Sequence, residues 1–287
     1  MSLLPSPTSP TRRTLGAALL SAALVLAGCA TTTPKTAAPT PAPAPAPAAQ
    51  PASPPPEPPG RVIFLGFALD SQAKAFRNDV LLADKWVSGI DPNALRIKLA
   101  NPASGQPADW PQATVENFTL VMAKTAEVAR PRDRVLLFVS GHSNPGVLNI
   151  TVDGKHRHPL TPQILGDALA PLAAKQVPTL VVISACYSGA FVEPLKAPQR
   201  VVLTATDARR AAFRCRYDGD HTPFAQALFG QDGVADLPVT AWMAQAQKAV
   251  AAQEKRRKLP PSLPQIFVGA EAQAWAGQPL RHWLPAP

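Results

Sequence analysis

Cysteine is scarce in this sequence: the 287 residues include only three, Cys29, Cys186 and Cys215. Two of them fall in the part expected to fold, and two cysteines do not make a disulfide framework. A single disulfide between Cys186 and Cys215 is kept as an alternative. The sequence also lacks a CxxC pair or a cysteine–histidine cluster at ligand spacing, so nothing argues for structural zinc. The basic run 155–158 holds two histidines and is interpreted as a solvated turn, not as a metal site.

The sequence lacks a hydrophobic run long enough for a comfortable membrane span. The apolar segment 15–26 follows Arg12 and Arg13 and would extend roughly 18 Å as a helix, against about 30 Å of bilayer hydrocarbon. We interpret residues 1–28 as a signal peptide. The segment ends in Leu-Ala-Gly-Cys29, which resembles a bacterial lipobox and implies lipidation of Cys29. An ordinary secretory signal with a chance cysteine is the alternative.

Proline, by contrast, is abundant, and it gathers after the signal segment. Of the 27 residues from Pro34 to Gly60, 12 are proline. Such a segment buries little and cannot donate the hydrogen bonds of a sheet, which predicts a solvated tether. Residues 29–60 are therefore expected to hold a folded domain, residues 61–287, away from the membrane by up to about 80 Å.

The charge of the chain is basic, with 28 lysines and arginines against 19 aspartates and glutamates. The run 255–258 closes a predicted helix, where positive charge favours the negative end of the helix dipole. Binding of nucleic acid or of an anionic membrane surface is a weaker interpretation of this run. We expect no nucleic-acid partner.

From residue 61 onward, short apolar runs alternate with longer amphipathic ones. Strands are predicted at 62–67, 95–99, 134–139, 179–183, 201–205 and 265–268. Helices are predicted at 72–87, 114–129, 161–174, 223–229 and 240–257, with a small hairpin at 147–152. This alternation predicts an α/β fold whose mainly parallel sheet is covered on both faces.

Two predicted strands run directly into reactive side chains. Strand 134–139 is followed by Ser-Gly-His142-Ser143, and strand 179–183 by Ser-Ala-Cys186-Tyr-Ser-Gly. Ligands of open α/β sheets bind beyond the carboxyl ends of the strands. If the two strands are neighbours, His142 and Cys186 emerge at one edge, an arrangement suited to thiolate attack on a carbonyl. A buried structural cysteine and a loop histidine are the alternatives.

These two segments, with His142 and Cys186 44 residues apart, resemble the legumain (hemoglobinase) family of cysteine peptidases, which is related to the caspases. Residues 191–195 and 201–215 extend the resemblance. It implies a three-layer α/β/α sandwich of the caspase/hemoglobinase type with a six-stranded sheet. It also implies a nucleophile, Cys186, and a general acid/base, His142, without metal or organic cofactor. The N–H groups of Ser143 and Cys186 would form the oxyanion hole.

This sequence matches the family at one further position, Arg77, and departs from it at two others. The family usually has glycine directly after the catalytic histidine, and the Cβ of Ser143 would narrow the site or disfavour a strained φ. Arg77 lies where relatives place an arginine of the primary specificity pocket, although a surface arginine is the alternative. The acidic residue that legumains use after the nucleophile has no obvious match, so a preference for asparagine is not supported.

The sequence therefore predicts a cysteine endopeptidase that acts on peptide or protein substrates and is tethered by lipid at Cys29. Ala30 follows Cys29 without an acidic residue, which resembles a signal for the outer membrane of the bacterial envelope, facing the periplasm. The alternative is a catalytically weak homologue that serves as a peptide-binding or structural lipoprotein. Cys215 is assigned no catalytic role.

Overall fold

The computed structural model describes residues 58–103, 105–212 and 219–283 of the chain. The predicted signal peptide, the lipidation site Cys29 and residues 29–57 of the predicted tether lie outside these residues, as does Cys215. Among the helices of the described ranges, none has the length and apolar character that crossing a bilayer requires.

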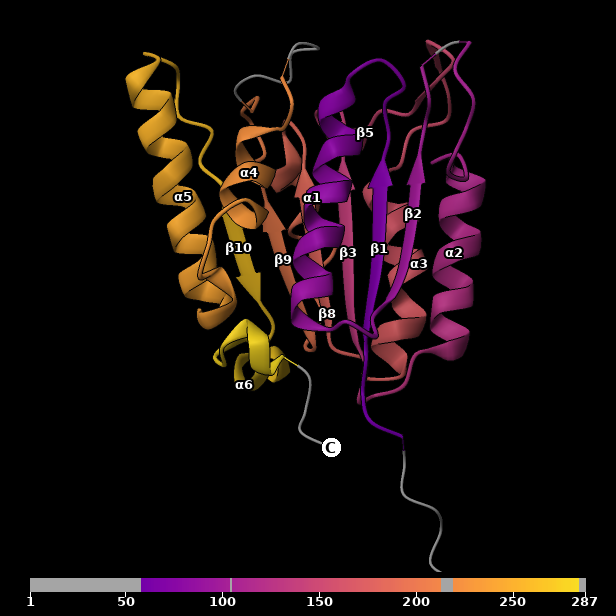
Figure 1. Ribbon diagram of the computed structural model, residues 1–287, viewed down its shortest axis with the longest axis vertical. Helices are drawn as coiled ribbons and strands as arrows, with labels where there is room; N and C mark the ends of the chain where they lie inside the picture. Colours follow the sequence, from indigo (N-terminus) through magenta and orange to yellow (C-terminus); the bar gives the residue numbers. More distant parts are fainter. Residues whose placement is uncertain (1–57, 104, 213–218, 284–287) are drawn as a thin grey trace, which may run out of the picture. The chain divides into compact units, whose positions relative to one another are not determined.

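One six-stranded sheet forms the centre of the folded domain (Figure 1). Its order is β10-β9-β8-β3-β1-β2, and every neighbouring pair is parallel except β10 with β9. The predicted mainly parallel six-stranded sheet is confirmed. The strands are β1 (Val62–Ala68), β2 (Leu95–Ala100), β3 (Arg134–Ser140), β8 (Thr179–Ser184), β9 (Arg200–Thr204) and β10 (Gln265–Val268).

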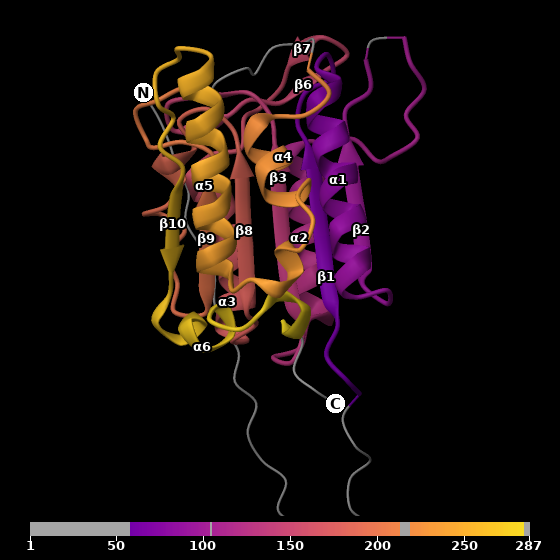
Figure 2. The same ribbon diagram turned by 60° about the vertical axis from the view of Figure 1, so that its left-hand side comes forward.

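Helices cover both faces of this sheet (Figures 1 and 2). Helices α1, α4 and α5 pack on one face, and α2 and α3 on the other. The three-layer α/β/α sandwich is thus confirmed. The helices are α1 (Lys74–Ile90), α2 (Val115–Val128), α3 (Pro162–Ala174), α4 (Pro223–Phe229), α5 (Val239–Arg256) and the short α6 (Gln273–Ala276), which was not predicted.

Threonine hydroxyls begin three of the helices. Thr114, Thr161 and Thr222 each accept a backbone N–H from the first turn of α2, α3 and α4, which satisfies donors that have no partner within the helix. Helix α1 begins differently. The carboxylate of Asp70 accepts the N–H groups of the two residues before the helix, each at 2.8 Å, so Asp70 fixes the entry to α1 next to the carboxyl end of β1.

Aromatic side chains join the three helices of one face. The rings of Trp86 in α1 and Trp242 in α5 stack with centroids 4.9 Å apart and planes inclined by 5°. Phe229 of α4 meets both edge-on, at 5.4 and 5.5 Å. The indole N–H of Trp242 donates to the carbonyl of Leu228 at 2.7 Å. Aromatic ring pairs such as these stabilise the fold by about 1 kcal/mol each, beyond the effect of the area that they bury.

The hairpin predicted at 147–152 is wrong in its pairing. The structure has two separate hairpins: β4 (Ser143–Asn144) with β5 (Val147–Leu148), and β6 (Thr151–Val152) with β7 (Lys155–His156). Positive φ angles at Gly146, Asp153 and Gly154 allow a tight turn inside each hairpin. The basic run 155–158 is exposed, as a solvated turn would be, but its first two residues are β7.

Candidate active site

His142 and Cys186 occupy equivalent places beyond two neighbouring strands. Strands β3 and β8 run parallel, and their last residues, Ser140 and Ser184, face each other in register. His142 and Cys186 each lie two residues further along. The N–H of Gly141 donates to the carbonyl of Ser184 at 3.3 Å, which keeps the two chains together past the end of the sheet. Both residues therefore lie at the same edge of the sheet.

His142 lies in a half-buried and largely apolar setting. Its ring meets that of Phe76 edge-on, with centroids 4.8 Å apart and planes at 86°. Its backbone carbonyl accepts the N–H of Asn149 at 2.9 Å. Burial lowers the pKa of His142 below its usual value, and the nearby negative charge of Asp70 opposes this by raising it. The setting favours the neutral imidazole, the form that accepts a proton.

The charge of Asp70 gives a prediction for the pKa of His142. Asp70→Asn removes the group that favours the imidazolium, while its side-chain oxygen can still accept the N–H groups before α1. We expect the pKa of His142 to fall further, measured by NMR titration of its ring protons in a Cys186→Ala background. A rise, or no change, would contradict the assigned proximity.

The same shift sets a direction for stability. Because the folded pKa of His142 lies below the unfolded one, the folded state binds fewer protons between the two values. The contribution of His142 to stability is therefore complete above the unfolded pKa of about 6.5. It is lost as the pH falls toward the folded pKa, and Asp70→Asn should deepen that loss.

Cys186 is half-buried, and a backbone amide contacts its sulfur. The N–H of Ala212 donates to Sγ at 3.3 Å, and the carbonyl of Ala212 lies 3.8 Å from Sγ. The backbone of Ala212 thus both donates to the sulfur and accepts from the thiol. The loop that follows β9 thus contributes to the surroundings of the cysteine, a contact that no local sequence pattern predicts.

A tight turn directly follows Cys186. Tyr187 takes the left-handed conformation, with φ 51° and ψ 16°, which costs a residue other than glycine on the order of 1–2 kcal/mol. Its N–H donates to the carbonyl of Arg210 at 2.8 Å. The buried Ser188 then donates its N–H to Thr206 Oγ1 at 2.9 Å. These bonds hold the turn that presents Cys186.

Ser143 is not strained. The described residues that adopt a positive φ do not include Ser143, so the expected conflict with a strained φ is wrong. Instead, its hydroxyl donates a short hydrogen bond to the carbonyl of Cys186. Ser143 pairs with Leu148, next to the position where the N–H of Asn149 donates to the carbonyl of His142. Hydrogen-bonded and non-hydrogen-bonded pairs alternate along two antiparallel strands, and a residue of a non-hydrogen-bonded pair points its N–H away from the partner strand. The amide of Ser143 is therefore not used by β5.

Arg77 lies in the first turn of α1 and is engaged at the surface. Its guanidinium forms an ion pair with Asp109 and lies over the ring of Trp110, 4.4 Å from the centroid. The arginine side chain is 37% exposed. These contacts fit the surface alternative as well as a substrate-binding role, which stays a prediction.

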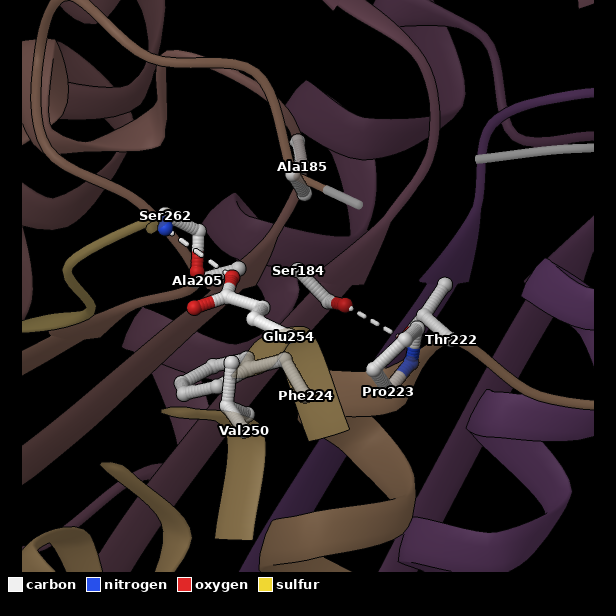
Figure 3. Close-up of a pocket in the computed structure, with 10 residues that line it drawn as sticks. Ser184, Ala185, Ala205, Thr222, Pro223, Phe224, Val250, Glu254 and Ser262 are labelled. Carbon is white, nitrogen blue, oxygen red and sulfur yellow. Dashed lines mark hydrogen bonds between the residues drawn. The ribbon is translucent and has the colours of Figure 1, made fainter. Parts of the chain in front are cut away.

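A small cavity is lined by Ala185 and Ala212, which adjoin and contact Cys186, and by residues of α4 and α5 (Figure 3). The hydrogen-bonded pair Ser184 and Thr222 lines it, as do Glu254 and Ser262, whose N–H donates to that carboxylate at 2.9 Å. The space open to the centre of a water-sized sphere is about 10 Å³. That is room for one water at most, so the cavity does not admit a substrate side chain as it stands.

Metal ligation finds no support in this part of the chain. Within residues 58–103, 105–212 and 219–283, no three carboxylate, histidine or cysteine side chains gather closely enough to hold an ion. Cys215, the other half of the disulfide considered above, lies outside these ranges.

Known proteins resemble this chain at two levels. Residues 99–257 match the sequence model of the peptidase C13 family. Among solved structures, caspase-1 from Spodoptera frugiperda is similar, with 16% sequence identity and a TM-score of 0.49 over 73% of this chain and 86% of that one. No curated protein sequence matches significantly.

Proposed function

The chain belongs to the peptidase C13 family, the legumain family of cysteine peptidases, and we propose that it is an endopeptidase with Cys186 as nucleophile and His142 as general acid/base. The observation that carries this proposal is the register of β3 and β8. The paired Ser140 and Ser184 bring the two reactive residues to one edge of the sheet at the same distance from its end.

The reaction consistent with this arrangement is acyl transfer through a thioester. His142 takes the proton of Cys186, and the thiolate attacks the carbonyl carbon of the scissile peptide bond. The carbon–nitrogen bond breaks as the imidazolium returns its proton to the leaving amine. Water then attacks the thioester, His142 accepts the proton of that water, and the carboxylic acid leaves with Cys186 restored as a thiol.

Backbone amides are proposed to stabilise the oxyanion that forms in both steps. The N–H of Ser143 is directed away from β5, and the Ser143 hydroxyl holds the carbonyl of Cys186. The backbone N–H groups of Ser143 and Cys186 would together supply two donors, each worth about 3 kcal/mol when aimed at the developing charge. On this proposal, Ser143 supplies the backbone donor at the position where the family usually has glycine.

Substrate binding is proposed to include Arg77, at the start of α1. Its ion pair with Asp109 would have to open before the guanidinium met a substrate. Arg77→Ala is then expected to raise KM with little change in kcat. A contact that binds the ground state and the transition state equally acts on KM alone. An unchanged KM would leave Arg77 as a surface residue.

A peptide library tests the proposed activity, because it offers many different peptide bonds to the protein at once. The full chain is incubated with a complex mixture of peptides, and new termini are identified by mass spectrometry. We expect cleavages with a shared residue before the scissile bond in the wild type and none in Cys186→Ala. Equal cleavage by both proteins, or none by either, would contradict the endopeptidase. The second result would instead favour a peptide-binding homologue.

The tether is a separate proposal, supported by the sequence Leu-Ala-Gly-Cys29 and the proline-rich residues that follow. We propose that lipid on Cys29 anchors the enzyme to the bacterial envelope, in the outer membrane facing the periplasm. The mass of the mature N-terminal peptide tests it: acyl chains on Cys29 are expected. An unmodified N-terminus beyond an ordinary cleavage site would show a secreted protein.

A further inference from the structure

A buried carboxylate lies beneath the edge that carries His142 and Cys186. Asp79, in the second turn of α1, is 0% exposed. Its Oδ2 accepts the hydroxyls of Ser140 and Thr222, both at 2.8 Å. Its Oδ1 accepts the N–H of Thr222 at 3.0 Å and lies 3.2 Å from Nδ1 of His221. Four hydrogen-bonding groups thus converge on one carboxylate.

This carboxylate is connected to the ends of both strands that carry the proposed dyad. Ser140 is the last residue of β3 and precedes His142 by two positions. The Thr222 hydroxyl also lies 2.8 Å from Oγ of Ser184, the last residue of β8, as Figure 3 shows. Because the Thr222 hydroxyl donates its proton to Asp79, the hydroxyl of Ser184 donates to Thr222.

The charged groups around Asp79 are few. The imidazole of His221, with a side chain 28% exposed, lies next to the carboxylate, and the exposed Lys74 and Asp220 pair with each other at 2.8 Å. Among the described residues, no lysine or arginine forms an ion pair with Asp79. Burial raises the pKa of Asp79, while the hydrogen bonds from His221, Thr222 and Ser140 lower it. The ionised form of the Asp79 carboxylate is therefore stabilised by these hydrogen bonds.

We propose that Asp79 is a positioning residue: by holding Ser140 directly and Ser184 through Thr222, it sets the placement of His142 relative to Cys186. This inference rests on the proposed function, since it concerns the same dyad. A misplacement of about 1 Å in such a pair lowers reactivity by as much as 10²-fold. A carboxylate that only stabilised the core would leave the reactivity of the thiol intact.

The test compares Asp79→Asn with Asp84→Asn in the full chain. Asp84 is a matched control, because it is also a buried aspartate of α1 but pairs with Lys98 and Arg96 of β2. Alkylation of Cys186 by iodoacetamide is followed across pH by mass spectrometry of its peptide. We expect both variants to melt at lower temperature. Only Asp79→Asn should alkylate about tenfold more slowly near neutral pH, with a shifted pH profile.

Thr222 provides a second route if Asp79→Asn does not fold. Thr222→Val breaks the link to Ser184 and is expected to slow alkylation in the same way, whereas Thr222→Ser keeps the hydroxyl and the wild-type profile. A wild-type profile in both Asp79→Asn and Thr222→Val would overturn the inference. His142→Ala separates the two proposals: if it also alkylates like the wild type, the dyad itself fails.

Discussion

His142→Ala is expected to lower kcat/KM for peptide cleavage by about 10²–10⁴-fold, the range that a lost general acid/base usually costs. Two steps would suffer together, because without the imidazole the thiol is not activated and the leaving amine is not protonated. Cys186→Ala is expected to remove all measurable cleavage, since it leaves no nucleophile. The measurement uses a peptide taken from the library screen, under conditions in which substrate is well below KM.

The other histidines of the domain supply the controls. His156, exposed on β7, should be replaceable by alanine without effect. His221 lies at the same edge of the sheet as Cys186 and contacts Asp79, so His221→Ala should weaken activity less than His142→Ala does. The reverse order would show that the base has been assigned to the wrong histidine.

Gly189→Ala is expected to lower the free energy of unfolding by about 3 kcal/mol, at the upper end of the cost of overpacking. A Cβ at this position would lie 2.6 Å from the amide nitrogen of Ala208 and 2.6–2.7 Å from backbone carbons of Asp207. Backbone cannot yield as a flexible side chain does. The loop would have to move, and with it Arg210 and Ala212, which contact Tyr187 and Cys186. Activity should fall as well.

Gly166 is the matched control for this prediction, measured by the same urea unfolding. It lies inside α3, and a Cβ there would have only the carbonyl of Pro194 nearby, at 3.8 Å. Gly166→Ala should therefore stabilise the domain by about 0.5–1 kcal/mol through helix propensity. If Gly189→Ala proved as stable as the wild type, the packing of residues 207–212 against the turn after Cys186 would be wrong.

The central sheet was predictable because buried parallel strands are continuous apolar runs. Val135–Val139 and Leu180–Ile183 are buried throughout, and such runs cannot face water on either side. Helical spacing was less exact as a guide to burial. In α1, Phe76 and Val80 are buried as the spacing predicts, but Leu81 is 37% exposed. The two small hairpins were missed because turn geometry, not hydrophobic spacing, sets their pairing.

The candidate site was predictable only where it lies at the ends of strands. Their position after two strands pointed to His142 and Cys186, and the resemblance to the legumain family supplied the roles proposed for them. The left-handed Tyr187 carried no signal, because glycine is the usual mark of that conformation. Asp79 reads as one more polar residue of an amphipathic helix. Its partners Ser140 and Thr222 lie 61 and 143 positions away, and no local pattern reveals contacts that only the folded chain creates.

Labelling with a peptidyl acyloxymethyl ketone, a probe that reacts with activated thiols, tests the dyad most directly. Wild type, Cys186→Ala, His142→Ala and Cys215→Ala are treated side by side as full chains. The dyad predicts rapid labelling of the wild type and of Cys215→Ala, and loss of labelling in both Cys186→Ala and His142→Ala. Equally slow labelling of the wild type and His142→Ala would show that the imidazole does not activate the thiol, and would contradict the proposed peptidase.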